Sequence, residues 1–276
     1  MCAAAQHSSD DMRLLSRTPR SAIWYDKNCK TIWKESPRTK REHENLQRIG
    51  AHTNIVACKN HVVSSEGRSF LILESASMDL LVFLKTMRRL HDTPANYQAI
   101  CMNFIEQMVL AIQHCHRTRN AHLDIKLENF LIFMYPKTQR HVVKLADFES
   151  AQEWDEGGML VLNRRIGTPS YQPPEIVLAT RPSKIHAAAI DVWALGIVCY
   201  CIWNNYLPWN AAKQGDPAFD KYTTGQKLHV YARTPKYVHS MLRIRPKDRP
   251  TIEEVFTMVQ EQHAQLRASS RLSCIV

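Results

Sequence analysis

Apolar side chains recur at helical spacing through the middle of the chain and mark segments that must be buried. Ile100, Phe104 and Met108 lie on one stripe, which predicts a helix with one face against the core. The run from Ala187 to Trp203 is apolar almost throughout and contains a single acidic residue, Asp191. It is shorter than the ~20 residues of a membrane span, and a carboxylate within it opposes insertion. We therefore expect a helix buried in the middle of a large lobe.

Shorter apolar runs predict strands. Residues 70–73 (FLIL) end at the polar Glu74 and predict a buried strand. Residues 130–145 hold two apolar runs separated by a polar stretch, and they predict a hairpin. Residues 1–13 are largely polar and unpatterned, so we expect a disordered lead, with order beginning near Leu14. The chain is thus expected to combine strands with long helices.

Composition places the chain among globular proteins. Its 276 residues are 45% apolar and 22% charged, enough to bury a core in one large or two small lobes. The formal charge is +10, but Lys and Arg are spread along the chain, so we do not expect a nucleic-acid partner. The eight cysteines show no CxxC spacing, and the N-terminus lacks the pattern of a secretory signal. We predict reduced thiols, no membrane anchor, and a cytoplasmic or nuclear location.

Two short blocks flank the predicted hairpin and carry groups suited to phosphoryl transfer. The first is HLDIKLEN (residues 122–129) and the second is LADFE (residues 145–149). Phosphoryl transfer needs a carboxylate to orient the attacking hydroxyl, oxygen ligands for magnesium, and cations for the developing charge. Asp124 can supply the orienting carboxylate, Asn129 and Asp147 the magnesium ligands, and Lys126 the cation.

The two blocks resemble the catalytic loop (H-R-D-x-K-x-x-N) and magnesium loop (D-F-G) of the eukaryotic-type protein kinase superfamily. Leu123 takes the place of the arginine, and Glu149 that of the glycine. A third block, GTPSYQPPE (residues 167–175), resembles the end of the activation segment in serine/threonine kinases. The resemblance covers residues 14–262, and the compact loops are similar to those of divergent kinases of large DNA viruses.

The resemblance implies an α+β, bilobal fold. A small β-rich N-lobe would span about residues 14–73, a hinge about 74–77, and a large, mainly helical C-lobe about 78–262, with 263–276 as a tail. The implied activity is transfer of the ATP γ-phosphate to serine or threonine of a protein substrate, with ATP and Mg²⁺ as cofactors. A monomer is expected.

The resemblance also implies roles for individual residues. Asp124, Lys126 and Thr168 would be catalytic, with Thr168 hydrogen-bonded to the other two, and Asn129 and Asp147 would bind the metal. Nucleotide contacts would come from Lys34, which pairs with Glu42 or, if the alignment slips, with Glu44; from Ile23 above the ring; and from backbone groups of Glu74 and Ala76. Leu73 would close the back of the pocket, and Asp79 is a weaker candidate near the ribose.

Further residues are implied to hold these groups in place. Asp191, at the head of a block that resembles D-x-W-x-x-G, would anchor the catalytic loop, because a buried carboxylate needs hydrogen bonds. Glu175 would pair with Arg249. His116 and His122 match structural positions of the family, which favours a packing role over a zinc site, since the usual ligand spacing is missing.

Two departures from the family pattern leave the function open between two classes. Ser16, Thr18 and Ser21 occupy the three glycine positions of the nucleotide loop, where side chains limit the approach of backbone amides to phosphates. Arg17 and Arg20 could replace those donors or could be solvated. With Glu149, these losses support a pseudokinase that acts as a binding module.

The retained polar residues favour an active enzyme. Lys34, Asp124, Lys126, Asn129 and Asp147 are all present, and a scaffold would have no need of the whole set. Regulation by loop phosphorylation is not expected, because residues 151–167 contain no Ser, Thr or Tyr and Leu123 replaces the arginine that would receive a phosphate.

Overall fold

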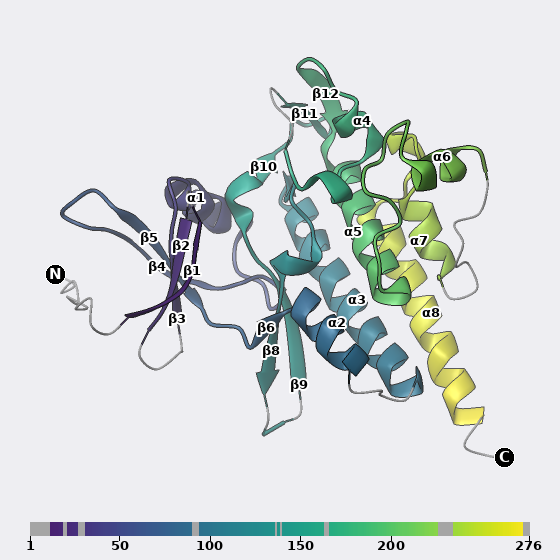
Figure 1. The fold of residues 1–276 in the computed structure, drawn as a ribbon, viewed down its shortest axis with the longest axis horizontal. Coiled ribbons are helices and arrows are strands. Elements are labelled where there is room, and N and C mark those ends of the chain that lie inside the picture. Colours follow the sequence, from purple (N-terminus) through teal and green to yellow (C-terminus); the bar gives the residue numbers. More distant parts are fainter. Residues whose placement is uncertain are drawn as a thin grey trace.

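The structure, a computed structural model, describes residues 12–18, 21–26, 31–89, 94–135, 137–138, 140–162, 166–225 and 234–272. For the first two of these segments it describes the backbone alone. The chain folds into two lobes, a small one built on a sheet and a larger one built from helices (Figure 1). The α+β, bilobal fold predicted above is confirmed.

The small lobe is a five-stranded antiparallel sheet with one helix. Its strands are β1 (Met12–Thr18), β2 (Ser21–Asp26), β3 (Thr31–Glu35), β4 (Cys58–Val63) and β5 (Ser69–Glu74), in the order β1-β2-β3-β5-β4. Helix α1 (Thr39–Ile49) buries Glu42, Asn45, Leu46 and Ile49, which recur three to four residues apart and so share one face. That face includes polar groups, which need partners outside the helix.

The large lobe contains the remaining helices and three small sheets. The helices are α2 (Leu80–Arg89), α3 (Pro94–Arg117), α4 (Pro174–Val177), α5 (Ala187–Asn204), α6 (Pro217–Thr223), α7 (Lys236–Met241) and α8 (Ile252–Leu272). One sheet has three strands in the order β6 (Met78–Asp79), β8 (Phe130–Tyr135), β9 (Arg140–Leu145). The other two sheets are pairs: β7 (Asn120–Ala121) with β10 (Gln152–Glu153), and β11 (Met159–Leu162) with β12 (Ser183–His186).

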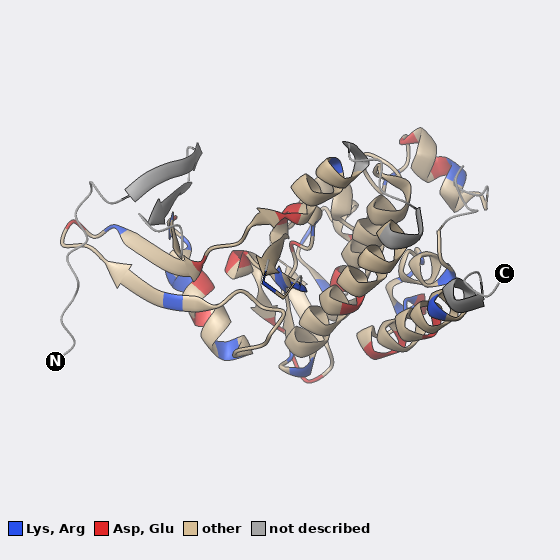
Figure 2. Cartoon of the chain, turned by 90° about the horizontal axis from the view of Figure 1, so that it is seen from below, with Lys and Arg blue, Asp and Glu red and all other residues tan. Residues whose placement is uncertain are grey.

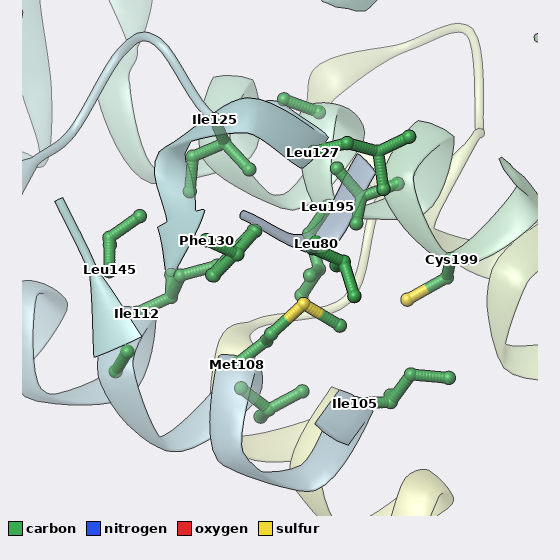
Figure 3. Packing of buried hydrophobic residues seen from close by; sticks show 14 of the residues in the cluster. Leu80, Ile105, Met108, Ile112, Ile125, Leu127, Phe130, Leu145, Leu195 and Cys199 are labelled. Atoms are coloured by element: carbon green, nitrogen blue, oxygen red, sulfur yellow. The ribbon is translucent and has the colours of Figure 1, made fainter. Parts of the chain in front are cut away.

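The core of this lobe lies between α3 and α5, with the catalytic block beside it. Ile105, Met108 and Ile112 of α3 belong to one cluster of buried side chains with Leu195 of α5 and Ile125 of the catalytic loop (Figure 3). Of the predicted stripe, Phe104 and Met108 are buried in this core and Ile100 is partly buried against it, so the stripe is confirmed as a core face.

Helix α5 is the one helix in the described part of the chain that is long and apolar enough to be compared with a membrane span, and 89% of it is buried inside the fold. A Cβ added at Gly196 would lie 2.9 Å from Leu242 Cδ2 and 3.0 Å from Met241 Cβ. The glycine thus permits close packing of α5 against α7 and the residue that follows it.

The boundaries observed differ from those predicted at both ends of the chain. Strand β1 begins at Met12, inside the expected disordered lead. Helix α8 runs through Leu272, so the boundary predicted at residue 262 lies inside a continuous helix. His263 is buried there, and its Nδ1 lies 3.2 Å from Glu106 Oε2 of α3, which ties this part of α8 to the lobe. Between the lobes, β5 ends at Glu74 and β6 begins at Met78, which places the connection at residues 75–77.

Lys, Arg, Asp and Glu occur on segments of both lobes (Figure 2).

The predicted pair of Glu175 and Arg249 is present and buried. The fully covered guanidinium of Arg249 donates to both carboxylate oxygens of Glu175 at 2.7 and 2.8 Å. It also donates to the carbonyls of Arg243, Ala189 and Ile244 and lies over the ring of Trp193. This pair ties α4 to the loop before α8.

Replacement of Glu175 by Ala should lower the free energy of unfolding by about 3 kcal/mol, because it leaves the buried guanidinium without a counter-charge. Urea unfolding of the purified variant measures this. The exposed pair of Arg245 and Asp248 is a control in the same loop, and Asp248→Ala should cost less than ~1 kcal/mol. Equal losses in the two variants would show that burial does not set the value of the pair.

Candidate active site

Lys34, Glu42 and Asp147 meet where the two lobes face each other. The ammonium of Lys34 on β3 lies 2.7 Å from Glu42 Oε2 on α1 and 2.6 Å from Asp147 Oδ1 in the large lobe. Glu42 is completely covered, while 30% of the Asp147 side chain is exposed. A cation of the small lobe is thus held between one carboxylate from each lobe.

The charge states of this trio follow from its geometry. Burial by itself lowers the pKa of Lys34, but the two carboxylates outweigh it and hold that pKa above its ordinary value. Burial raises the pKa of Asp147, and the ammonium of Lys34 overcomes this and holds the pKa below its ordinary value. Lys34 is therefore protonated and Asp147 ionised throughout the physiological range.

The short interval between Lys34 and its partner has a structural reason. Helix α1 begins only at Thr39, so Glu42 lies in its first turn and still faces the strand. Glu44 is on the exposed side of the helix, where Lys40 lies 4.0 Å away. Glu42 is therefore the partner of Lys34, and the alternative assignment to Glu44 is wrong.

A second network surrounds Asp124 in the large lobe. Its carboxylate accepts hydrogen bonds from Lys126 Nζ (2.7 Å) and from Thr168 Oγ1 (2.9 Å), and Lys126 Nζ lies 3.3 Å from Thr168 Oγ1. The hydrogen bonds predicted for Thr168 are thus present. They orient the carboxylate and bring a lysine to within contact of it.

Asn129 and Asp147 have the donor atoms that magnesium prefers. Asn129 donates its Nδ2 to the carbonyl of Asp124 at 2.8 Å, which turns its Oδ1 in the opposite direction. Asp147 adds a carboxylate. Two oxygen ligands suit Mg²⁺, which usually completes its octahedron with waters and substrate phosphates. Among the described residues no group of three His, Cys, Asp or Glu could hold a metal by itself, so the residues fit a metal that arrives with a nucleotide.

Two residues of the site have left-handed backbone, which non-glycine residues adopt only at a cost. Leu123 has φ 66°, and Asp147 has φ 66° and ψ 62°. The carboxylate of Asp191, buried in α5, accepts hydrogen bonds from the amides of His122 and Leu123 at 2.8 Å each. Asp191 therefore anchors the catalytic loop, as predicted.

The three histidines near the loop have structural partners. His122 Nε2 lies 2.9 Å from the carbonyl of Ala146, His116 Nε2 lies 3.1 Å from Asp191, and His114 Nε2 lies 2.9 Å from the carbonyl of Ile49. They point to different places, which agrees with the packing role given to His116 and His122.

The structure describes only some of the groups that were predicted to contact the nucleotide. The Glu74 carboxylate accepts from the amide of Ala57 and from Lys144, both at 2.7 Å, so its side chain is already engaged. Asp79 accepts from the amide of Val82 in the first turn of α2. The roles of the Glu74 and Ala76 backbone groups stay predictions. Ile23 lies in β2 opposite Lys34, and its side chain is outside the described residues.

The nucleotide loop can be compared with its prediction only in backbone register. Thr18 of β1 pairs with Ser21 of β2, so two of the three substituted glycine positions face each other at the end of a tight hairpin. The side chains of Ser16, Arg17, Thr18 and Ser21 and the whole of Arg20 are outside the described part of the chain.

Two residues that bind the magnesium loop were missed by sequence reasoning. Asn45 donates its Nδ2 to the carbonyls of Phe148 and Ala151 at 2.7 and 3.1 Å. Arg38 Nη1 lies 2.9 Å from Glu149 Oε1. Arg38 lies four residues before Glu42 and Asn45 lies three residues after it, a spacing that places all three on one face of a helix. That spacing was the signal available in the sequence.

Comparison with known proteins agrees with this geometry. Residues 22–259 match the family described as Protein kinase domain. The chain is 28% identical over 239 residues to Probable serine/threonine-protein kinase MARK-C of Dictyostelium discoideum, covering 85% of this chain and 29% of that protein. It is 28% identical to CBL-interacting protein kinase 24 of Oryza sativa subsp. japonica, covering 76% and 44%.

A third relative is Tribbles homolog 1 of Homo sapiens, which is 26% identical over 212 residues, covering 75% of this chain and 53% of that protein. The chain therefore spans well under two thirds of the length of these relatives.

Replacement of Asp191 by Ala should lower the free energy of unfolding by about 3 kcal/mol, because two buried amides and His116 lose their acceptor. Asp191→Asn keeps one acceptor oxygen and should cost less. Thermal and urea unfolding of both variants measure the difference. If Asp191→Ala is as stable as the parent, the carboxylate does not hold the loop.

Proposed function

The chain belongs to the protein kinase family, and from that premise we propose that it transfers the γ-phosphoryl group of ATP to serine or threonine hydroxyls of protein substrates. The observation that carries the proposal is the presence of two charged networks: Lys34 with Glu42 and Asp147 where the lobes meet, and Asp124 with Lys126 and Thr168 in the large lobe. Together they provide the charges that this chemistry needs. Because the relatives are longer, the substrates of the whole protein are part of the proposal.

In the proposed reaction the substrate hydroxyl oxygen forms a bond to the γ-phosphorus while the bond from that phosphorus to the ADP oxygen breaks. Asp124 orients the hydroxyl and accepts its proton. Thr168 and Lys126 keep the Asp124 carboxylate in one orientation, and the ammonium of Lys126 offsets the negative charge of the transferred group. Proton removal and charge stabilisation thus come from adjacent side chains.

Lys34, kept protonated by its two carboxylates, would hold the phosphates of ATP. Asn129 and Asp147 would hold Mg²⁺, which neutralises phosphate charge when bound. The contribution of the protein is to fix these oxygens: Asn129 through the carbonyl of Asp124, and Asp147 through Lys34.

A pseudokinase is the second candidate, and the nucleotide loop favours it. Ser16, Thr18 and Ser21 replace all three glycines, which limits the approach of backbone amides to phosphates. These replacements weaken ATP binding, because side chains limit the approach of the amides, but they remove no group that acts on the reacting atoms. Activity is therefore favoured.

We also propose that the enzyme needs no activation by loop phosphorylation. Leu123 stands where the family has a phosphate-binding arginine, and it is buried in an apolar cluster beneath the activation segment. The other buried members of this cluster are Ala121, Leu160, Leu162, Ile166, Ile176, Ile185, Ala187 and Ile190. Strand β11 of this segment is also hydrogen-bonded to β12. Burial of one leucine contributes about 2 kcal/mol, more than the roughly 1 kcal/mol of strain in its backbone.

Three further expectations remain as stated above. The location in cytoplasm or nucleus, the monomeric state and the absence of a nucleic-acid partner stay predictions.

Asp124→Asn should abolish phosphate transfer and leave the affinity for Mg-ATP nearly unchanged, because Asp124 acts on the incoming hydroxyl. Asp147→Asn should weaken Mg-ATP binding by about tenfold or more, because it removes a metal ligand. Transfer of labelled phosphate and calorimetric binding of Mg-ATP separate the two effects. Parent rates in both variants would refute the assignment, and binding without transfer by the parent protein would identify a pseudokinase.

Protein made in bacteria should already be fully active, because apolar contacts hold the described part of the activation segment without a phosphate. Treatment with a phosphatase should change its rate by less than about twofold, whereas a loop stabilised by phosphate would lose its charge-assisted hydrogen bonds. The rate is measured before and after treatment, with mass spectrometry of the segment as a control. A large loss traced to a phosphorylated residue in this segment would contradict the proposal.

A further inference from the structure

Glu149 lies directly after Asp147 and Phe148, where the family has a glycine. Its Oε1 is 2.9 Å from Nη1 of Arg38, the residue that precedes helix α1. The two side chains are 25% and 38% exposed, so the pair is partly shielded from water. The substitution therefore adds a contact between the magnesium loop and the small lobe.

This contact extends a series of bonds along one face of α1. Glu42 accepts a hydrogen bond from the amide of Phe148 at 3.2 Å, and Asn45 donates to the carbonyls of Phe148 and Ala151. Arg38 lies one turn before Glu42, so it reaches the next residue of the loop. The helix thus binds the loop through backbone groups on two turns and through an ion pair on a third.

Each carboxylate of this region has a cationic partner only when Arg38 is included. Glu42, Asp147 and Glu149 bring three carboxylates to the place where α1 meets the magnesium loop. Lys34 contacts the first two, at 2.7 and 2.6 Å, and Arg38 contacts the third. Without Arg38 the carboxylate of Glu149 would add uncompensated negative charge beside the buried Glu42, which would push the loop and the helix apart.

We propose that Arg38 and Glu149 are positioning residues that hold the magnesium loop against α1 and thereby set the orientation of Asp147. The inference rests on the proposed function in that Asp147 is taken as the metal ligand. A glycine leaves many backbone conformations open to the loop. Here an ion pair selects the conformation in which Asp147 has left-handed backbone and faces Lys34.

The test is the affinity for ADP measured by calorimetry with Mg²⁺ and, separately, with EDTA. Arg38→Glu and Glu149→Arg should each weaken Mg-ADP binding about fivefold, which corresponds to about 1 kcal/mol, the upper value for a partly exposed ion pair. The affinity for metal-free ADP should stay within about twofold, because the pair acts through Asp147. The double variant Arg38→Glu/Glu149→Arg restores the opposite charges and should return Mg-ADP affinity to within about twofold of the parent.

A second readout does not depend on any nucleotide. Hydrogen exchange at the amide of Phe148, which donates to Glu42, should be faster in both single variants and return toward the parent rate in the double variant. Arg38→Lys keeps the positive charge and should behave like the parent in both measurements.

The matched control is the pair of Arg68 and Glu35, which also lies in the small lobe, with 48% and 26% of the side chains exposed and a closest distance of 2.7 Å. Arg68→Glu should leave the magnesium-dependent part of ADP binding unchanged. An equal effect of Arg68→Glu and Arg38→Glu would overturn the proposal, as would a double variant no better than the singles. A parent protein that binds Mg-ADP as expected but transfers no phosphate would refute the proposed function and leave this inference standing.

Discussion

The ammonium group of Lys34 joins the charged groups of the two lobes. It comes from the small lobe and is paired with Glu42 of the same lobe and Asp147 of the other. Burying three charges costs several kcal/mol for each ion, and only close mutual contact offsets that cost. The arrangement therefore persists only while α1 and the magnesium loop stay in place. This explains why α1 uses polar side chains on the face that it buries: Glu42 and Asn45 satisfy backbone groups of the loop and hold it at the distance that the ion pairs require.

Leu123 and Asp147 of the large lobe have strained, left-handed backbones, which other contacts must stabilise. Asp191 stabilises the first by accepting two backbone amides, and Lys34 stabilises the second by binding its carboxylate. Strain of this kind persists when the surrounding contacts over-determine it. Asp191 in turn can be buried because the two amides and His116 supply its hydrogen bonds. The position of the catalytic loop is thus fixed from the core of the lobe outward.

The parts of this architecture that sequence predicted are those in which a residue type has one plausible partner. An acidic residue in an apolar helix, Asp191, needs donors, and the predicted bonds to the catalytic loop are present. The pair of Glu175 and Arg249 followed from the resemblance in the same way. The contacts of Arg38 and Asn45 were missed, because polar residues of a helix are ordinarily solvated and these partners lie more than 100 positions away in the sequence; only their spacing from Glu42 hinted at a shared face. The predicted boundary at residue 262 falls within α8, where the sequence lacks a strong apolar period and contact with α3 supports the helix.

Regulation follows from the physical nature of the contacts that order each loop. An apolar cluster around Leu123 supports the activation segment, and such contacts depend little on salt and cannot be removed by a phosphatase. The contacts between α1 and the magnesium loop are of the opposite kind, since they are charged, partly exposed and weakened by salt. A protein that lacks a phosphate switch in its activation segment would therefore respond most readily at α1, where a change of about 1 kcal/mol in one ion pair shifts the loop population about fivefold. On the proposed regulation, control therefore lies at helix α1 of the small lobe rather than at the activation segment of the large lobe.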